Sequence, residues 1–574
     1  MKMRGKSRRE GAISFTFDGR KIECDADVSV AAALANVGEF HLRTSGEDDQ
    51  RGIFCGMGVC QECRVTIDGV HGMRACMTSV RPGMEVQRGG IPGLTNSRAE
   101  HQLQEQSAVV EPELLVIGGG AGGLTAAAIA AEAGVDVVLL DERPSKGGQY
   151  FKQPAKQDLL HESLLDDNQI VTGRKLLDRV ARSGAKIVNR AEVWGAFVPG
   201  EFAVHDGNGS TIYRPKKTIV ATGAYERGMP LPGWTLPGVM TTGATQGMLR
   251  NYGTVPEGRI VIAGNGPLNL QIALELKRAG ADVRLVAELS NPSALTWIGS
   301  GLKMALNVPR FATDGIAYLR GLKKAQVPVR FGHCLLGITA TPDGLEASIG
   351  RVRGDAVDPI ETIAADVVCM GYGFQPSNEI LRCLGCSHQF DDWRGHLVAE
   401  RDNECETTLP GVYAVGDCAG LSGAPAAMQD GTLAAVAVVR SLGYSVSAKH
   451  DAERQRALRA RPHHRAFQSA LWTLFHARRI STQLATEETT VCRCEAVTLG
   501  DIEAAVKDGA TSLGGIKQRT RLGMGPCQGR YCAANAAEFL ADRTGEAVDE
   551  YSYFAPRPPL KPVRIEDIVG RAKL

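Results

Sequence analysis

The stretch Leu114-Leu-Val-Ile-Gly-Gly-Gly-Ala-Gly-Gly-Leu-Thr125 decides the fold of the largest part of the chain. An apolar run typical of a buried strand leads into Gly118-x-Gly120-x-x-Gly123, and an alanine-rich helical segment follows. In this context Gly118 makes the tight turn, Gly120 lets the backbone approach a pyrophosphate, and Gly123 allows close packing of helix on strand. The helix N-terminus then faces the phosphates. The pattern predicts a dinucleotide-binding α/β unit.

Further matches in the expected order along the chain predict that the dinucleotide is FAD. Asp141 ends the next strand, 18 residues after Gly123, where a carboxylate would accept hydrogen bonds from the ribose hydroxyls. Ala221-Thr222-Gly223 matches the motif at which two-dinucleotide-domain reductases leave the FAD domain, and Gly416-Asp417 resembles their late motif, whose Asp holds the ribityl chain. The residues predicted to bind FAD are Gly118, Gly120, Gly122, Gly123, Asp141, Glu142, Gln149, Thr222, Gly223, Gly416 and Asp417.

A second strand, glycine turn and helix pattern begins at Arg259, so we expect an inserted unit that splits the FAD domain. Here Gly264-Asn-Gly266 is followed by Asn269, where a third glycine would allow close helix packing, and the match to an NAD site is weakened. Glu288 ends the following strand at the place of a ribose acceptor, which favours NAD over NADP. Three interpretations stay open: NAD binding, an adenine nucleotide held structurally, or a scaffold without a ligand.

Cys55, Cys60, Cys63 and Cys76 have the spacing of a plant-type [2Fe-2S] ferredoxin, C-x4-C-x2-C with a fourth cysteine further on. Glycines in the loop let its backbone curl and turn N–H groups toward the sulfurs. A zinc site is the alternative, but zinc sites normally pair cysteines as C-x2-C twice. The flanking pattern predicts a small β-grasp domain with strands over 13–17, 21–24 and 64–67 and a helix over 30–37.

A second quartet lies near the other end of the chain: Cys492-Arg-Cys494, followed by Cys527 and Cys532 as C-x4-C. It closely resembles the module of bacterioferritin-associated ferredoxin, which implies a small helical domain with a second [2Fe-2S] cluster. The basic run 517–521 between the two pairs suits an anionic cluster, because cations offset thiolate charge. Structural zinc is again the alternative.

The composition indicates which kinds of partner the protein can bind and in which cellular compartment it functions. Lys and Arg number 65 against 64 Asp and Glu, and a net charge of +1 provides no general field for nucleic acid or anionic lipid. No apolar run follows the basic first ten residues, and glycines and acidic residues interrupt the most apolar stretch, 114–140. Clustered rather than spread cysteines fit a reducing compartment. We expect a cytoplasmic protein that spans no membrane and binds no nucleic acid.

The fold class expected is α/β, a two-dinucleotide-binding-domain flavoprotein core with an iron–sulfur domain at each end. The expected parts are a ferredoxin domain at 11–95, a linker at 96–112, the FAD domain at 113–250 and 371–447, an NAD-like insert at 251–370, a helical connector interrupted at Pro462 at 448–486, a second cluster domain at 487–547, and a Pro-rich tail lying extended on the surface at 548–574.

In this order the modules resemble a fusion of the small 2Fe-2S subunit and the FAD subunit of opine oxidases, D-hydroxyproline dehydrogenase, hydrogen cyanide synthase and heterotetrameric sarcosine oxidase. Gly147-Gly-Gln149, Ala224-Tyr-Glu-Arg227 and 371–377 are further points of likeness. The resemblance implies an FAD-dependent oxidoreductase acting on CH–NH donors as one member of a complex.

The family's division of labour implies the partners. An FAD-containing subunit of the amino-acid-oxidase type would oxidise an opine, hydroxyproline, sarcosine or glycine type of substrate, with a flavin at the interface between the two chains. This chain would then relay electrons to a protein or quinone acceptor. No acid–base group for substrate oxidation is identified in the sequence, so catalytic residues are left unassigned. The rival interpretation is a self-contained NAD(P)H-dependent reductase that delivers electrons to a protein.

Overall fold

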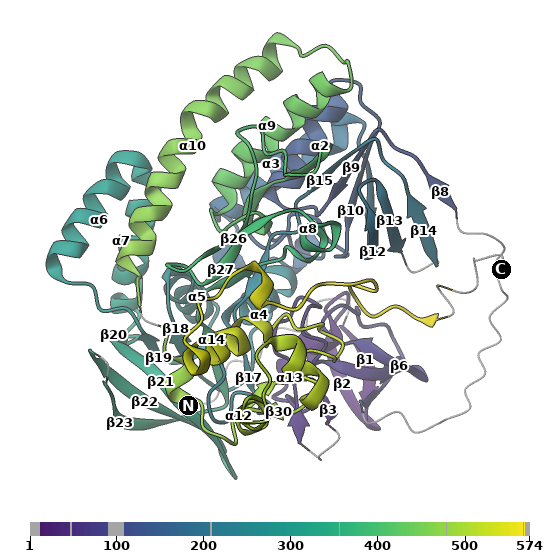
Figure 1. Cartoon of the computed structure of the whole chain (residues 1–574). Coiled ribbons are helices and arrows are strands. Elements are labelled where there is room, and N and C mark those ends of the chain that lie inside the picture. The colour runs from purple at the N-terminus through teal and green to yellow at the C-terminus, as the bar shows by residue number, and fades with distance from the viewer. Residues whose placement is uncertain are drawn as a thin grey trace.

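The computed structural model of the chain describes residues 12–45, 49–89, 108–206, 209–354, 356–477, 479–565 and 568. Most of the expected linker and the last residues of the expected tail therefore lie outside the described part. Two parallel five-stranded sheets form the centre, and the two cysteine-rich modules lie side by side against them at the base of the view in Figure 1. The division into domains at the residues given above stays a prediction.

The first sheet carries the opening glycine motif and has the strand order β11-β10-β9-β15-β28. Its strands β9 and β10 are short apolar runs buried from both faces, as the centre of a parallel sheet covered by helices requires. The alanine-rich α2 packs against α9, and their small side chains allow close approach. The elements are β9 (Leu114–Ile117), α2 (Ala121–Glu132), β10 (Val137–Asp141), α3 (Asn168–Ser183), β11 (Lys186–Asn189), β15 (Lys217–Val220), β28 (Val412–Ala414) and α9 (Ala424–Ser441).

The second parallel sheet belongs to the inserted unit and has the order β17-β24-β18-β19-β20. Its edge strand β17 precedes the insert's glycine motif in the chain. A three-stranded antiparallel sheet, β21-β22-β23, packs beside it. The elements are β17 (Val239–Thr241), α4 (Thr242–Tyr252), β18 (Arg259–Gly264), α5 (Pro267–Arg278), β19 (Asp282–Glu288), α6 (Ala294–Asn307), α7 (Pro309–Lys324), β20 (Val329–Phe331), β21 (His333–Thr341), β22 (Gly344–Arg353), β23 (Ala356–Ala365) and β24 (Val367–Gly371).

Smaller sheets, one of them mixed and the others antiparallel, complete the core around the two parallel sheets. The four-stranded sheet β12-β13-β14-β8 packs beside the first parallel sheet, and short ribbons join the two halves. The elements are β8 (Val109–Val110), β12 (Glu192–Val198), β13 (Glu201–His205), β14 (Ser210–Tyr213), β16 (Ala224–Glu226), β25 (Phe374–Pro376), α8 (Glu379–Leu384), β26 (His388–Asp391) and β27 (His396–Ala399).

The N-terminal module is a mixed five-stranded sheet in the order β2-β1-β7-β5-β6 with one helix against it. The hydroxyl of Ser29 accepts the amide of Ala32 and so caps this buried helix. The strands and helix that the sequence predicts here are all present. The elements are β1 (Ala12–Phe17), β2 (Arg20–Asp25), α1 (Val30–Ala35), β3 (Arg43–Thr44), β4 (Gln50–Arg51), β5 (Arg64–Ile67), β6 (Val70–Arg74) and β7 (Glu85–Arg88).

The C-terminal third differs from expectation in two places. Helix α10, which forms most of the connector, runs unbroken through Pro462, because buried side chains such as Ala457 and Phe467 hold it against α9 and α6. The Pro-rich tail does not lie only on the surface: Leu560 is 3% exposed, and Lys561 pairs with Glu142 of the FAD unit. The elements are α10 (Ala448–Leu474), α11 (Ser481–Leu484), β29 (Thr490–Cys492), β30 (Val497–Thr498), α12 (Leu499–Lys507), α13 (Leu513–Thr520) and α14 (Ala533–Thr544).

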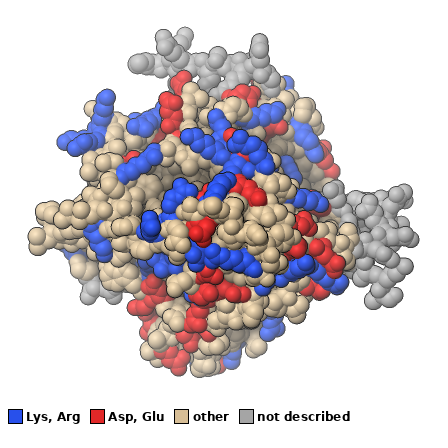
Figure 2. All heavy atoms as spheres, turned by 90° about the horizontal axis from the view of Figure 1, so that it is seen from above, with Lys and Arg blue, Asp and Glu red and all other residues tan. Residues whose placement is uncertain are grey.

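The outer surface carries both signs of charge. Figure 2 shows Lys and Arg in a band across one face with Asp and Glu interspersed among them. This mixture agrees with the net charge of +1. Within the part of the chain that the structure describes, no helix has the length and apolar character needed to cross a membrane.

Candidate functional site

A cavity of about 1200 Å³ lies between the two parallel sheets and brings together the residues predicted to bind FAD. Ten of these eleven residues line it, although they come from four separate stretches of the chain. The exception is Gly123, which lies behind the glycine turn: a Cβ there would be 1.9 Å from the carbonyl oxygen of Gly118. That distance is the close helix approach that the motif predicts.

Gly120 is the position at which the chain leaves room for a ligand. A Cβ on Gly120 would meet only the Cα of Gly148, at 4.0 Å, and would otherwise point into the cavity. Gly120 also precedes the first turn of α2, so the unpaired amides of that turn face the same space. This cradle fits the pyrophosphate of a dinucleotide.

Two carboxylates of the set predicted to bind FAD accept hydrogen bonds from backbone amides at the cavity wall. Asp141 is buried at the end of β10 and accepts hydrogen bonds from the amides of Gly119 at 2.6 Å and Arg143 at 2.8 Å. Asp417 accepts the amides of Ser422 and Gly423, both at 2.8 Å. Burial raises the pKa of both carboxyl groups above the ordinary value. Both line the cavity, and the remaining capacity of their oxygens is available to hydroxyl groups of a ligand.

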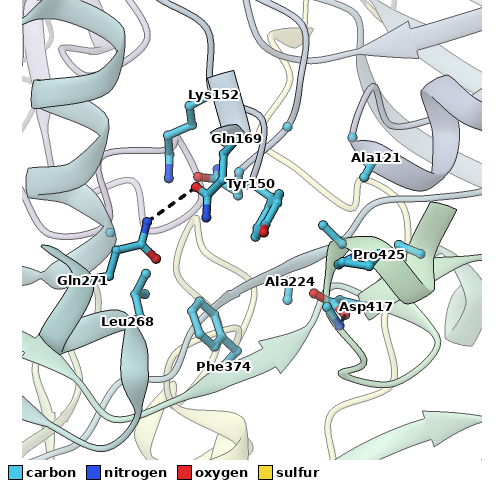
Figure 3. Close-up of a pocket in the computed structure, with 18 of the residues that line it drawn as sticks. Ala121, Tyr150, Lys152, Gln169, Ala224, Leu268, Gln271, Phe374, Asp417 and Pro425 are labelled. Atoms are coloured by element: carbon cyan, nitrogen blue, oxygen red, sulfur yellow. Dashed lines mark hydrogen bonds between the residues drawn. The ribbon is translucent and has the colours of Figure 1, made fainter. Parts of the chain in front are cut away.

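The cavity has a second end, away from the FAD motifs. Figure 3 places Ala121, Pro425 and Asp417 on one side and Lys152, Gln169 and Gln271 on the other, with the two glutamine side chains in contact at 3.5 Å. This end was not identified from the sequence, because its polar residues come from α3, from α5 and from the loop that holds Lys152, and they carry no common motif. A polar wall at this position suits the head of a flavin or another polar ring.

Lys152 and Glu226 are buried at this second end. The ammonium of Lys152 donates to Gln246 Oε1 at 2.7 Å, and the carboxylate of Glu226 accepts the amide of Gly243 at 2.8 Å. Burial lowers the pKa of Lys152 to about 7 and raises the pKa of Glu226 to about 7. Both groups therefore titrate near neutrality, which is where proton transfer is easiest to arrange.

Replacing Lys152 with methionine is expected to make stability less dependent on pH. The unfolded chain protonates this lysine with a pKa of about 10.4, whereas the folded value is about 7. Between these values the unfolded state binds more protons, so this group's contribution to stability rises with pH. The variant should gain stability relative to the wild type as the pH falls from about 10 to 7, which urea unfolding at several pH values measures. Lys186→Met, at an exposed position, is the control. A pH-independent difference would contradict the expectation.

The insert's glycine motif repeats the arrangement seen around Asp141, although it does not line the cavity. Glu288 is fully buried and accepts the amide of Gly266 at 2.9 Å and the side chain of Asn265 at 3.0 Å. Asn269 occupies the place of the third glycine and fills it by bonding to the carbonyl of Gly371 at 2.9 Å and to Thr242 at 3.0 Å. Helix α5 is thus held to its sheet by an amide bridge rather than by glycine contact.

The first cysteine quartet is buried in the N-terminal module and its sulfurs meet in pairs. Cys55 contacts Cys60, and Cys63 contacts Cys76. The amide of Cys60 donates to the sulfur of Cys55 at 3.3 Å. Four thiolates in two pairs, with amides on the sulfurs, are what a two-iron cluster with two cysteines on each iron requires. The donor set therefore fits a [2Fe-2S] cluster.

The second quartet is held between β29, the end of α13 and the start of α14. The sulfurs of Cys492 and Cys494 are 3.9 Å apart, those of Cys494 and Cys527 are 3.7 Å apart, and Cys532 contacts Cys492. The four thiols thus gather at one place, which also fits a cluster. In the described residues, no three His, Cys, Asp or Glu side chains surround the position of a single ion.

Two buried guanidinium groups, those of Arg493 and Arg530, lie beside the second quartet, and neither belongs to the predicted basic run. Arg519 bonds to carbonyls of its own module, and Arg521 pairs with Glu495 on an exposed surface. Arg493 is 4% exposed and reaches the N-terminal module. The sequence feature that indicates this cation is Cys492-Arg493-Cys494, because it places an arginine between two cysteines of the quartet. Lys561 was missed because nothing in the tail's composition links it to Glu142.

Three family models match the chain in turn. A 2Fe-2S iron-sulfur cluster binding domain matches residues 10–89, a pyridine nucleotide-disulphide oxidoreductase matches residues 112–431, and a sarcosine oxidase A3 domain matches residues 486–571. The second model alone covers more than half of the chain and includes every residue of the predicted FAD set.

Three curated relatives are subunits of an opine oxidase, a hydrogen cyanide synthase and a sarcosine oxidase. An opine oxidase component of Rhizobium meliloti (strain 1021), the A subunit, is 31% identical over 79% of this chain and 98% of its own length. Hydrogen cyanide synthase subunit HcnB of Pseudomonas aeruginosa is 30% identical over 78% of this chain and 96% of its own length. The alpha subunit of sarcosine oxidase from R. meliloti is 24% identical over 99% of this chain and 58% of its own length.

Among solved structures, L-proline dehydrogenase from P. horikoshii has the same fold, with a TM-score of 0.71 and 19% identity over 98% of this chain and 99% of that one. The similarity in fold and the similarity in sequence thus point to related proteins. The chain belongs to the pyridine nucleotide-disulphide oxidoreductase family and to the family of the opine oxidase A subunits, and it is an FAD-dependent oxidoreductase with a 2Fe-2S domain.

Proposed function

We propose that this chain is the electron-transfer subunit of a multi-subunit dehydrogenase for amines or imino acids of the opine, hydroxyproline, sarcosine or glycine type. A partner subunit of the FAD-containing amino-acid-oxidase type oxidises the C–N bond. This chain then relays the electrons to an acceptor protein or a quinone. The flavin and the iron–sulfur clusters supply the electron transfer when bound, and the chain's residues supply position and electrostatics.

The observation that carries the proposal is that both cysteine loops reach the flavin cavity. Met57 lies between Cys55 and Cys60 and lines the cavity, where its sulfur is 3.7 Å from the amide nitrogen of Gln149. Arg530 lies between Cys527 and Cys532 and lines the same cavity. A flavin site in contact with two cluster loops is suited to passing electrons on. The relatives' names, which are those of oxidase subunits, support the same interpretation.

Co-expression with the neighbouring reading frames tests the partner. We expect mass spectrometry to find a subunit of the FAD amine-oxidase type that co-purifies. Under anaerobic conditions, an opine, hydroxyproline, sarcosine or glycine should bleach the flavin of this chain only when that subunit is present. A chain that purifies alone and is fully active on an amine would contradict the proposal.

An NAD(P)H-dependent reductase is the second candidate, because the amide of Gly266 and the carboxylate of Glu288 repeat the arrangement of Gly119 and Asp141. In that case NADH alone should bleach the flavin. Under the main proposal it should not, because Asn269 occupies the space that a third glycine would leave for close helix packing. The same anaerobic bleaching experiment therefore distinguishes the two candidate functions.

Iron analysis checks the two cluster sites. We expect four irons per chain, since each [2Fe-2S] cluster holds two. Cys527→Ala should halve the iron content, because its sulfur lies 3.7 Å from Cys494 within the quartet. The matched control is Cys334→Ala, a buried cysteine far from both quartets in sequence, which should keep all the iron. Zinc in place of iron would overturn the cluster assignment.

A further inference from the structure

We propose that Arg493 joins the two iron–sulfur sites into one unit in which electrons pass directly between the clusters, without returning to the flavin. This inference rests on the proposed function, because it assumes that both quartets hold clusters. Arg493 is a positioning residue: its charge and its packing hold the two sites against each other.

The two quartets share a wall. A small cavity of about 10 Å³ is lined by residues of both modules, although they are more than four hundred positions apart in the chain. Its lining includes all four cysteines of the second quartet, so Cys60 and Glu62 of the N-terminal module lie at the edge of the second cluster site. The residues are Cys60, Glu62, Cys492, Arg493, Cys494, Cys527, Tyr531 and Cys532.

Arg493 enters this contact from the C-terminal module and is clamped between aromatic rings. Its guanidinium carbon lies 4.0 Å from the ring centre of Phe54 and 4.8 Å from that of Trp234. One terminal nitrogen donates to the carbonyl oxygen of Trp234 at 2.5 Å, and the other lies 3.5 Å from Glu62. The stacking fixes the plane of the guanidinium, as only arginine allows.

Part of the guanidinium is left without a hydrogen bond. Its Nε and Nη2 are buried and have no hydrogen-bond partner among the described residues. Buried donors without partners are rare and costly, and these two belong to a side chain that lines the contact between the quartets. One acceptor that the structure shows is Glu62 Oε2, which lies 3.5 Å from Nη2 and is itself without a hydrogen bond in the described part of the chain. A sulfur of a bound cluster would be a further acceptor.

The charges at the contact between the two quartets support the same role for Arg493. Two clusters bound by thiolates place negative charge on both sides of the contact, and water is excluded from it. A buried cation lowers the free energy of the more negative, reduced form of each cluster, because the local dielectric constant is low. Glu62, 1% exposed, opposes this effect from the N-terminal side.

With both clusters bound, the step between them would be a one-electron exchange in which one cluster is oxidised and the other is reduced. No bond forms or breaks and no proton moves, so no further reactant is needed. The chain's part in the step is to hold Cys60 and the second quartet against one wall and to keep water out.

Electron paramagnetic resonance of the holoprotein reduced with dithionite tests the contact. We expect the spectrum of the fully reduced protein to show a magnetic interaction between two clusters. It should differ from the sum of the spectra of Cys63→Ala and Cys527→Ala, which each retain one cluster. Four irons per chain with two non-interacting signals would overturn the inference and leave the proposed function standing.

Redox titration tests the role of Arg493. Arg493→Gln should lower the midpoint potentials of both clusters by the equivalent of about a tenfold change in equilibrium constant, roughly 59 mV for one electron. Glu62→Gln should shift them in the opposite direction, because it removes a negative charge from the same contact. Arg543→Gln, an exposed arginine of the same module that pairs with Glu503, should shift neither.

The test does not depend on the folding of every variant. If Glu62→Gln is the only variant that folds, its cluster potentials must still be higher than those of the wild type. The spectrum of the wild type tests the contact between the clusters without any variant. A shift in Arg493→Gln no larger than in Arg543→Gln would contradict the role of Arg493, as would shifts of the same sign in the Arg493 and Glu62 variants. Absence of the second pair of irons would instead contradict the cluster assignment itself.

Discussion

Replacing Gly120 with valine is expected to leave the fold intact and to remove most of the flavin. The backbone of Gly120 has φ −84° and ψ −171°, which valine adopts without strain. Its side chain would enter the cavity at the mouth of α2, where the pyrophosphate is expected to lie. Even a loss of about 1.4 kcal/mol of binding energy weakens affinity tenfold. The dissociation constant for FAD should therefore rise by about tenfold or more, and the FAD released per chain on denaturation after dialysis should fall.

The matched control is Gly299→Val, which adds the same side chain to helix α6 where a Cβ meets nothing within 4 Å. This variant should keep its flavin. Circular dichroism should show the same helical content in both variants and in the wild type. Full flavin content in Gly120→Val would mean that the cavity does not bind FAD through this turn.

Removing the carboxylate of Glu62 is expected to cause the largest loss of stability. Glu62 is buried where three arginines converge, with Arg43 at 2.9 Å, Arg493 at 3.5 Å and Arg51 at 4.0 Å. Removing one partner of a buried ion pair typically costs about 3–5 kcal/mol, because the remaining charge is left uncompensated. Glu62→Ala leaves the charges of Arg43 and Arg493 without this partner, whereas Arg51 keeps its pair with Asp49 at 3.2 Å. The cost should therefore reach at least the lower end of that range.

Chemical unfolding of the holoprotein, followed by fluorescence, measures this difference. Glu85→Ala on the exposed side of β7 is the control and should change stability by less than about 0.5 kcal/mol. Glu62→Gln, which keeps an oxygen for Arg43, should fall between the two. Equal stability of Glu62→Ala and Glu85→Ala would show that the arginine cluster is compensated by other groups.

Much of the flavin site follows from the sequence, because its residues lie in short motifs with local geometry. The turn at Gly118 and Gly120 and the carboxylate of Asp141 are separated by one strand and one helix. Parallel pairing of β9 with β10 then brings turn and carboxylate together without any information from elsewhere. The first quartet is similar, since three of its cysteines lie on a single loop. Positive φ angles of 62° at Gly56 and 82° at Gly58 give that loop the curl that its glycines predict.

Only the tertiary structure places the residues that connect these sites. Arg493 reaches Glu62 across 431 positions, and Lys561 reaches Glu142 across 419. No periodicity or spacing records such contacts, because they depend on how whole modules pack. The same holds for α10, where packing on its neighbours outweighs the break that Pro462 favours. Local motifs fix what each module binds, whereas the burial of charge between modules fixes how the sites are joined, since a charge withdrawn from water must find its partner wherever the fold brings one.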